Sequence, residues 1–148
     1  MGKAILAGVV GYVALFVVLF ATFTGLYVVV GAGRAFKPGS YDVSNLWLGA
    51  AVVVNLFAAI VGGLVCRKIA GRVKPVRGFA VVVFALGLAM AGWSAFNVKP
   101  EAVRGGDVKN LAAMQDARVP SWFEFTNSFT GAIGILIGGR ALGSKKRD

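Results

Sequence analysis

The chain has 148 residues, of which 57% are hydrophobic and only 15% are charged, and its formal net charge at neutral pH is +10. A soluble domain carries about 25% charged residues, so this composition excludes an ordinary soluble domain and favours a protein that lies partly in lipid. The chain contains no histidine, which excludes imidazole metal sites and histidine general bases. It contains one cysteine, which excludes an internal disulfide.

Three long stretches of the chain carry no charged residue: residues 4–33, 43–66 and 78–98, which contain thirty, twenty-four and twenty-one residues. Each is long enough to cross a hydrocarbon core of about 30 Å at about 1.5 Å per helical residue. None alternates apolar and polar residues as a membrane strand does, and only a helix or a closed barrel satisfies its backbone in lipid. These stretches predict transmembrane helices at about residues 4–30, 44–66 and 77–98.

The fourth apolar stretch is shorter, because only fifteen residues separate Glu124 from Arg140. The residues before it contain Ser-x-x-Glu, the pattern of a capping box, with Ser121 as N-cap and Glu124 at the third helical position. Glu124 then lies at the level of the headgroups, and capping accounts for its presence. We therefore predict a fourth transmembrane helix at about residues 122–142.

The connecting segments complete a single transmembrane domain over residues 1–148, with an inner loop at residues 67–76 and outer loops at residues 31–43 and 99–121. In the longer outer loop, Asp107 is placed to cap a short helix over residues 108–117. Such a helix either lies flat on the membrane or folds over the mouth of the bundle. A solvated loop without a helix is the alternative.

Basic residues predict the orientation of the chain. With the N-terminus inside, ten basic residues lie on the inner side and six on the outer side, as the positive-inside rule requires. Trp47, Trp93 and Trp122 then fall near the outer ends of three helices, where aromatic belts form. The predicted fold is all-α, a four-transmembrane-helix bundle with both termini inside. The inner basic residues are Lys3, Arg67, Lys68, Arg72, Lys74, Arg77, Arg140, Lys145, Lys146 and Arg147.

The second and fourth predicted helices share a short pattern. Asn, Phe and Gly recur at the same spacing in residues 55–62 and 127–134, and both helices run from outside to inside. This predicts two duplicated helical hairpins related by an axis along the membrane normal. Chance similarity within a restricted set of residue types is the alternative.

Few polar residues lie within the predicted spans. The candidate polar positions are Asn55, Asn127 and Thr130. An interhelical hydrogen bond is the structural interpretation of Asn55, and a polar lining for a small-solute or ion path is the functional one. No Asp, Glu, Lys or Arg lies in the interior of the first three spans, and the sequence indicates no catalytic, cofactor-binding or metal-binding residue.

Two further groups of residues are candidates for contacts. Small residues at four-residue spacing predict close helix packing at Gly8, Gly11, Gly62, Gly63, Gly134 and Gly138. The basic residues of the inner loop predict contact with anionic headgroups, through Arg67, Lys68, Arg72, Lys74 and Arg77. Expected partners are therefore membrane lipids, with a second copy or another membrane protein as a further candidate, and no nucleic acid.

The layout resembles a broad group of small, uncharacterised bacterial four-helix membrane proteins. The resemblance is carried by Gly8 and Gly11, by Gly62-Gly63 with Arg67 beyond them, by Pro120-Ser121-Trp122, and by Gly138-Gly139-Arg140. It implies a multi-pass protein of the bacterial inner membrane. From the lack of ionisable residues at depth, we expect a non-enzymatic packing or accessory membrane protein; a small channel or transporter for a small solute or ion is the alternative.

The orientation leads to a first prediction. Reporter fusions after Lys74 and at the C-terminus should read cytoplasmic, and a fusion within residues 99–121 should read external, because the basic residues divide ten to six. Paired alkaline phosphatase and fluorescent protein fusions measure this. A cytoplasmic signal from residues 99–121 would contradict the orientation.

Overall fold

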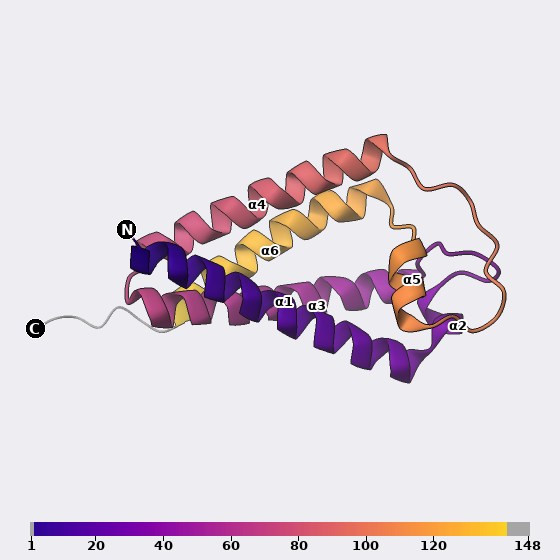
Figure 1. The fold of residues 1–148 in the computed structure, drawn as a ribbon, viewed down its shortest axis with the longest axis horizontal. Helices are drawn as coiled ribbons and strands as arrows, with labels where there is room; N and C mark the ends of the chain where they lie inside the picture. The colour runs from indigo at the N-terminus through magenta and orange to yellow at the C-terminus, as the bar shows by residue number, and fades with distance from the viewer. Residues whose placement is uncertain (1, 142–148) are drawn as a thin grey trace, which may run out of the picture.

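The computed structural model describes residues 2–141, and these residues form an all-helical chain (Figure 1). They contain six helices and no strand, with only isolated β-bridges in the connecting segments. The prediction of an all-α fold is confirmed. The predicted helix end at residue 142 and the C-terminal basic cluster lie outside the described residues. The helices are α1 (Gly2–Val30), α2 (Ala32–Ala35), α3 (Asn45–Ala70), α4 (Val73–Phe96), α5 (Asn110–Asp116) and α6 (Ser121–Ala141).

The four long helices run the length of an elongated molecule and form two antiparallel pairs (Figure 1). α1 packs against α3, and α4 packs against α6, while α3 and α6 share the most extensive contact in the bundle. The short helices α2 and α5 lie together at one end, here called the α5 end. The tight turn between α3 and α4 marks the opposite end, here called the turn end.

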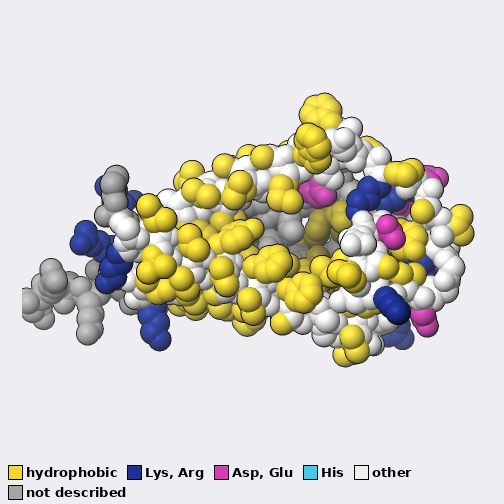
Figure 2. Space-filling view, viewed as in Figure 1, with side chains coloured by type: hydrophobic (Ala, Val, Ile, Leu, Met, Phe, Trp, Pro, Cys, Tyr) yellow, Lys and Arg dark blue, Asp and Glu magenta, His cyan; other side chains and the backbone are white. Residues whose placement is uncertain are grey.

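Three of these helices, α1, α3 and α4, are long and apolar enough to cross a membrane. α6 has 21 residues, but its Glu124, its Arg140 and several glycines and hydroxyl residues lower its mean hydropathy. Large apolar side chains are nevertheless exposed along it at Phe125, Phe129 and Ile133. Figure 2 shows hydrophobic side chains over the middle of the molecule and charged side chains at both ends.

The turn between α3 and α4 is shorter than the predicted inner loop at residues 67–76. α3 continues to Ala70 and α4 begins at Val73, so only two residues lie outside helices. Gly71 adopts a left-handed conformation with φ of 72°, and its N–H donates to the carbonyl of Arg67 at 2.9 Å. Basic side chains at the end of a helix also suit the negative end of its dipole, which favours the longer α3.

The predicted capping box at the start of α6 is wrong. The helix begins at Ser121 itself, and the N–H of Phe123 donates to the carbonyl of Pro120 at 2.9 Å. The carboxylate of Glu124 does not reach back to Ser121; it accepts a hydrogen bond from Ser94 of α4. A tertiary partner therefore competes with the local cap that the sequence pattern suggested.

The connection between α4 and α6 folds over the α5 end of the bundle. α5 begins at Asn110, and Lys109 rather than Asp107 occupies its N-cap position without a side-chain cap. The Tyr27 hydroxyl donates to the carbonyl of Val108 at 2.7 Å, and Asn110 Nδ2 donates to Thr24 Oγ1 at 3.1 Å. Of the alternatives predicted for this segment, a short helix folded over the bundle mouth is the one observed.

Glycines let the long helices approach until their backbones touch. A Cβ atom at Gly11 would lie 2.9 Å from the carbonyl oxygen of Gly62, and one at Gly62 would lie 2.9 Å from the carbonyl oxygen of Gly11. Cβ atoms at Gly63 and Gly138 would collide with the backbones of Ile135 and Ile60. These contacts hold α1, α3 and α6 together in the half of the bundle nearer the turn end.

Two of the remaining predicted packing glycines behave differently. Gly134 lies in the α3–α6 contact, where a Cβ would meet the Ala59 side chain at 2.7 Å and the Leu56 carbonyl at 2.9 Å. Among residues 2–141, Gly8 has no neighbour within 4 Å of an added Cβ, so it makes no close packing contact with this part of the chain. The spacing alone did not distinguish the two, because it does not show which face of a helix meets a neighbouring helix.

The glycine contacts lead to a second prediction. Gly63→Ala and Gly138→Ala should each lower the free energy of unfolding by about 1–3 kcal/mol, because rigid backbone blocks the new methyl group. Gly8→Ala is the matched control, and it should leave stability unchanged or raise it slightly, because the site is open and alanine favours helix. Thermal unfolding in one detergent measures all three. Equal effects at Gly8 and Gly63 would contradict the packing.

Candidate functional site

A cleft of about 700 Å³ lies between the two helix pairs, toward the α5 end. α4 and α6 supply most of its lining, with Leu15 from α1 and Asn55 from α3. Figure 2 shows the molecule hollowed in its middle. The cleft forms because α1 and α4 meet near Phe79 at the turn end, where its ring lies 3.2 Å from a Cβ built at Gly11, and diverge beyond it.

An acidic side chain lies on this cleft. Glu124 Oε1 accepts a hydrogen bond of 3.0 Å from the Ser94 hydroxyl, which connects α6 to α4. Glu124 Oε2 is buried and has no hydrogen-bond partner among residues 2–141. No basic side chain of the described chain lies within ion-pair distance of the carboxylate. A carboxylate oxygen that is buried without a donor costs free energy, so Glu124 is an incompletely satisfied polar side chain beside the cleft.

The two predicted asparagines meet at the same cleft. Asn55 is buried, and its Nδ2 donates to the backbone carbonyl of Asn127 at 3.0 Å. This is the interhelical hydrogen bond expected of Asn55. The side-chain Oδ1 of Asn127 is buried and lacks a partner among the described residues. Two buried acceptors of residues that line the cleft, Glu124 Oε2 and Asn127 Oδ1, therefore have no donor within this part of the chain.

Thr130 is not part of this group. Its hydroxyl donates to the carbonyl of Thr126, one turn earlier on its own helix, at 3.0 Å. It does not line the cleft. The structure thus brings Asn55 and Asn127 together and leaves the third predicted polar position with a bond inside α6.

A second hollow, of about 320 Å³, connects the cleft to the surface of the α5 end. Ser94, Lys99 and Glu124 line both hollows, so the carboxylate lies where they join. Asp42 and Arg118 line the outer hollow as well. The charged outer hollow and the larger cleft therefore adjoin each other at Glu124 and its neighbours.

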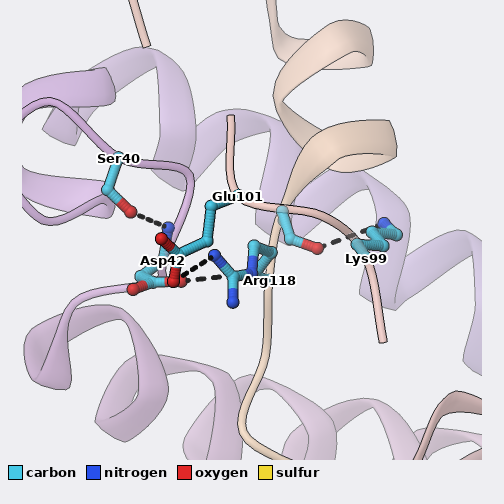
Figure 3. Close-up of polar contacts among 6 residues, drawn as sticks. Ser40, Asp42, Lys99, Glu101 and Arg118 are labelled. Atoms are coloured by element: carbon cyan, nitrogen blue, oxygen red, sulfur yellow. Dashed lines mark hydrogen bonds and ion pairs between the residues drawn. The ribbon is translucent and has the colours of Figure 1, made fainter. Parts of the chain in front are cut away.

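A polar network holds the walls of this entrance in place (Figure 3). The Arg118 guanidinium lies 3.5 Å from carboxylate oxygens of both Asp42 and Glu101, and the backbone N–H of Arg118 donates to the Tyr41 carbonyl at 2.9 Å. These bonds tie the segment before α6 to the segment before α3. Exposed ion pairs contribute little to stability, so the network mainly fixes the position of the loops.

Lys99 lies at the rim of the cleft. Its ammonium group donates to the backbone carbonyls of Gln115 and Ala117, the latter at 3.1 Å, and forms no ion pair among the described residues. An ammonium has three donors, and two of them are used in this way. Lys99 therefore contributes a positive charge to the mouth of the cleft while Glu124 contributes a negative charge below it.

A third hollow, of about 250 Å³, lies under α5 on the other side of Asn127. Aromatic side chains dominate its lining, and Phe23 and Tyr27 pack against Trp47 with ring centroids 5.6 Å and 6.0 Å apart. The Tyr27 hydroxyl already donates a hydrogen bond to the Val108 carbonyl. This hollow is an apolar space beneath a helical cover, and its only link to the cleft is the shared lining residue Asn127.

The predicted anionic-lipid residues lie at the opposite end. Arg67 and Lys68 belong to the last turn of α3, and the other three lie at the start of α4. None of the five lines the cleft. The side chains of four are exposed at the turn end, namely Lys68, Arg72, Lys74 and Arg77.

Comparison with known proteins gives no relative: no family model, no curated protein and no solved structure matches the chain. Within residues 2–141 there is no group of three or more His, Cys, Asp or Glu side chains placed to hold a metal ion. Cys66 is fully buried in the core.

Sequence reasoning missed the principal residues of the cleft, Ser94, Lys99 and Glu124. Glu124 carried a signal, since it is the one acidic residue within the helical part of the last apolar segment, but the local Ser-x-x-Glu pattern accounted for it. Ser94 and Lys99 carried none. Their importance depends on the packing of α4 against α6, which a local pattern does not reveal.

The asparagine contact leads to a third prediction. Asn55→Leu should lower the free energy of unfolding by about 1–2 kcal/mol or less, because it removes one interhelical hydrogen bond and leaves a helical carbonyl in place. Thr130→Val is the control, and a smaller effect is expected, because the hydroxyl bonds only within α6. Unfolding equilibria in mixed micelles measure both. A loss of several kcal/mol at Asn55, or an equal loss at Thr130, would contradict this account.

Proposed function

We propose that the protein is an integral inner-membrane protein that crosses the membrane four times and binds a small amphiphilic solute in the cleft, without enzymatic activity. α6 is the fourth span in this proposal. Its 21 residues cover about 31 Å at 1.5 Å per residue. Its outward face carries a bulky apolar residue every four positions and its inward face carries glycines, the reverse of a helix that faces water. The outward residues are Phe125, Phe129, Ile133 and Ile137.

The charges of the two ends support an orientation with the turn end inside. The described part of the turn end carries basic side chains and no acidic one, whereas all five described acidic residues lie toward the α5 end (Figure 2). The N-terminus lies at the turn end, and α6 also runs toward it. By the positive-inside rule the turn end faces the cytoplasm. Its exposed basic side chains are then placed to contact anionic headgroups.

The contact of α3 with α6 supports the duplication of a helical hairpin. Asn55 meets Asn127, 72 positions later. Gly63 meets Ile135 at the same separation, since 135 minus 63 is also 72. Two contacts between equivalent positions, about two turns apart, are expected when two related parallel helices pack across an approximate two-fold axis. The pairing of α1 with α3 and of α4 with α6 agrees with this arrangement.

One observation carries the binding function: the carboxylate of Glu124 lines a large cleft with no cation within ion-pair distance among the described residues, and the buried amide oxygen of Asn127 beside it has no donor among them. A bundle that acts by packing alone has no use for such groups, because each buried unpaired acceptor costs free energy. Glu124 and Asn127 therefore favour the solute-binding class among the functions considered from the sequence. The apolar walls supplied by Leu15, Val83 and Leu86 suit a solute with an apolar portion.

The half of the bundle nearer the turn end supports a closed cleft rather than an open channel. Backbone contact of Gly63 with Ile135 and of Gly138 with Ile60 leaves no room between α3 and α6 there. Gly11 and Phe79 close the space between α1 and α4. A solute enters from the outer side and stops within the bundle, as expected of a binding protein or of one state of a carrier.

One observation, the open surface around Gly8, favours an accessory role in which the protein packs against another membrane component. Gly8 lies on α1 with open space around it, although the equivalent four-residue spacing elsewhere makes close contacts. A second copy of the chain or another membrane protein is the partner that this surface suits. This role does not compete with solute binding, because Gly8 lies near the turn end and away from the cleft.

The cleft leads to a fourth prediction. With Cys66 replaced by alanine, Ser94→Cys should react with a membrane-impermeant maleimide added from outside, because thiolate formation requires water and the cleft opens to that side. Val53→Cys is the matched control. It is 67% exposed on α3, two residues from Asn55 and close to the depth of Ser94, but it faces away from the cleft.

Labelling rates of the two variants decide the outcome. The Ser94 variant should label at least about tenfold faster than the Val53 variant, and excess solute or lipid should slow only the former. Equal, slow labelling of both would contradict a hydrated cleft and with it the proposed function. Labelling of the Ser94 variant only from the cytoplasmic side would contradict the orientation.

A further inference from the structure

The charges on the cleft form a complementary pair. Its lining contains one acidic side chain, Glu124, and one basic side chain, Lys99, and the rest of its lining is neutral. Lys99 is fixed at the mouth by the carbonyls of Gln115 at the end of α5 and of Ala117 just beyond it, and Glu124 hydrogen-bonds Ser94 of α4. The two do not form an ion pair with each other. A ligand with two opposite charges can therefore meet each of them separately.

The acidic position requires a donor. Glu124 Oε1 already accepts the Ser94 hydroxyl, and its Oε2 and the Oδ1 of Asn127 have no partner within residues 2–141. The charge of a carboxylate is shared by both oxygens, so a cation that reaches it from the cleft compensates the whole group. A carboxylate that lines the cleft accepts charge-assisted hydrogen bonds, so an ammonium that carries N–H bonds suits Glu124 better than a fully methylated one.

The basic position requires an anion. Two of the three donors of Lys99 bind the carbonyls of Gln115 and Ala117, which are neutral, so its positive charge is not balanced there. A phosphate at the mouth of the cleft would balance it. Phosphate above and ammonium below is the order in which a headgroup that bends into the cleft presents its charges.

The walls of the cleft suit an apolar chain. Leu15, Val83, Leu86 and Met90 line it, and Leu86 and Met90 are also exposed on the outer surface of the molecule, at 52% and 74%. α1 contributes a single residue to the lining, so the cleft is open along the side between α1 and α4. An acyl chain can pass through this opening and remain in the bilayer while the headgroup occupies the polar part.

From these four features we propose that the cleft binds an ethanolamine phospholipid of the outer leaflet, with its ammonium at Glu124 and Asn127 and its phosphate at Lys99. This inference rests on the proposed function and specifies the solute. Phosphatidylcholine has the same charges but no N–H on its nitrogen, and phosphatidylglycerol has the phosphate but no ammonium. Each lacks one feature that the cleft matches.

The experiment is a fifth prediction, made on the purified full-length protein in detergent. Native mass spectrometry would measure the binding of phosphatidylethanolamine, its mono- and dimethyl derivatives, phosphatidylcholine and phosphatidylglycerol, all with identical acyl chains. The wild-type protein should bind phosphatidylethanolamine about tenfold more tightly than phosphatidylcholine, because the latter loses a charge-assisted hydrogen bond. The largest step should come with the last methyl group, which removes the last N–H. Equal affinities along the series would overturn the inference.

Variants assign the effect to residues. Glu124→Gln should reduce phosphatidylethanolamine binding to the level of phosphatidylcholine, and Glu124→Asp should keep part of the preference. Lys99→Gln should weaken both lipids by a similar factor and leave their ratio unchanged. Lys68→Gln, at the opposite end of the bundle, is the control and should change neither lipid. Retention of the full preference in Glu124→Gln would overturn the assignment.

The comparison of phosphatidylethanolamine, its methylated derivatives and phosphatidylcholine uses the wild-type chain, so it tests the inference even if a variant at Glu124 does not fold. Failure of the inference is also distinct from failure of the proposed function. A Ser94→Cys variant that labels from outside, together with equal lipid affinities, would leave a solute-binding cleft with another ligand. A Ser94→Cys variant that does not label would contradict a hydrated cleft and therefore the proposed function.

Discussion

The fold depends on the contact of α3 with its neighbours through backbone rather than side chains. Gly62 and Gly63 bring α3 against α1 on one side and against α6 on the other, at distances that leave no room for a Cβ atom. In a lipid environment no hydrophobic force draws apolar helices together, so close approach and its dispersion contacts supply much of the association. The bulky residues are then free to face outward, as Phe57 of α3 and Phe129 of α6 do.

This constraint acts mainly in one half of the molecule, and the cleft is its consequence. Where the glycines end, α1 and α4 separate, and polar side chains occupy the space between the helix pairs. Asn55 and Ser94 bridge the helices there with single hydrogen bonds. Each such bond contributes about 0.6 kcal/mol, which helps to position Glu124 and Asn127 beside the cleft.

The α5 end limits access to this space without filling it. α5 is attached to α1 through the Tyr27 and Asn110 hydrogen bonds, and Arg118 joins the loops beside the entrance. The aromatic hollow beneath α5 stays separate from the cleft except at Asn127. The two hollows therefore differ in chemistry: one is apolar and covered, and the other is charged at its mouth and open toward the side.

The sequence by itself determined the all-helical fold and three of the apolar helices, because length and hydropathy are local properties that lipid imposes on any spanning segment. It also identified Asn55 and most of the packing glycines. Tertiary structure alone decided that Gly8 lies outside the interior, that residues 67–76 are largely helical, and that Glu124 serves α4 rather than its own helix end. Those outcomes depend on which face of each helix packs against which neighbour. That pairing is determined by contacts between residues far apart in the chain.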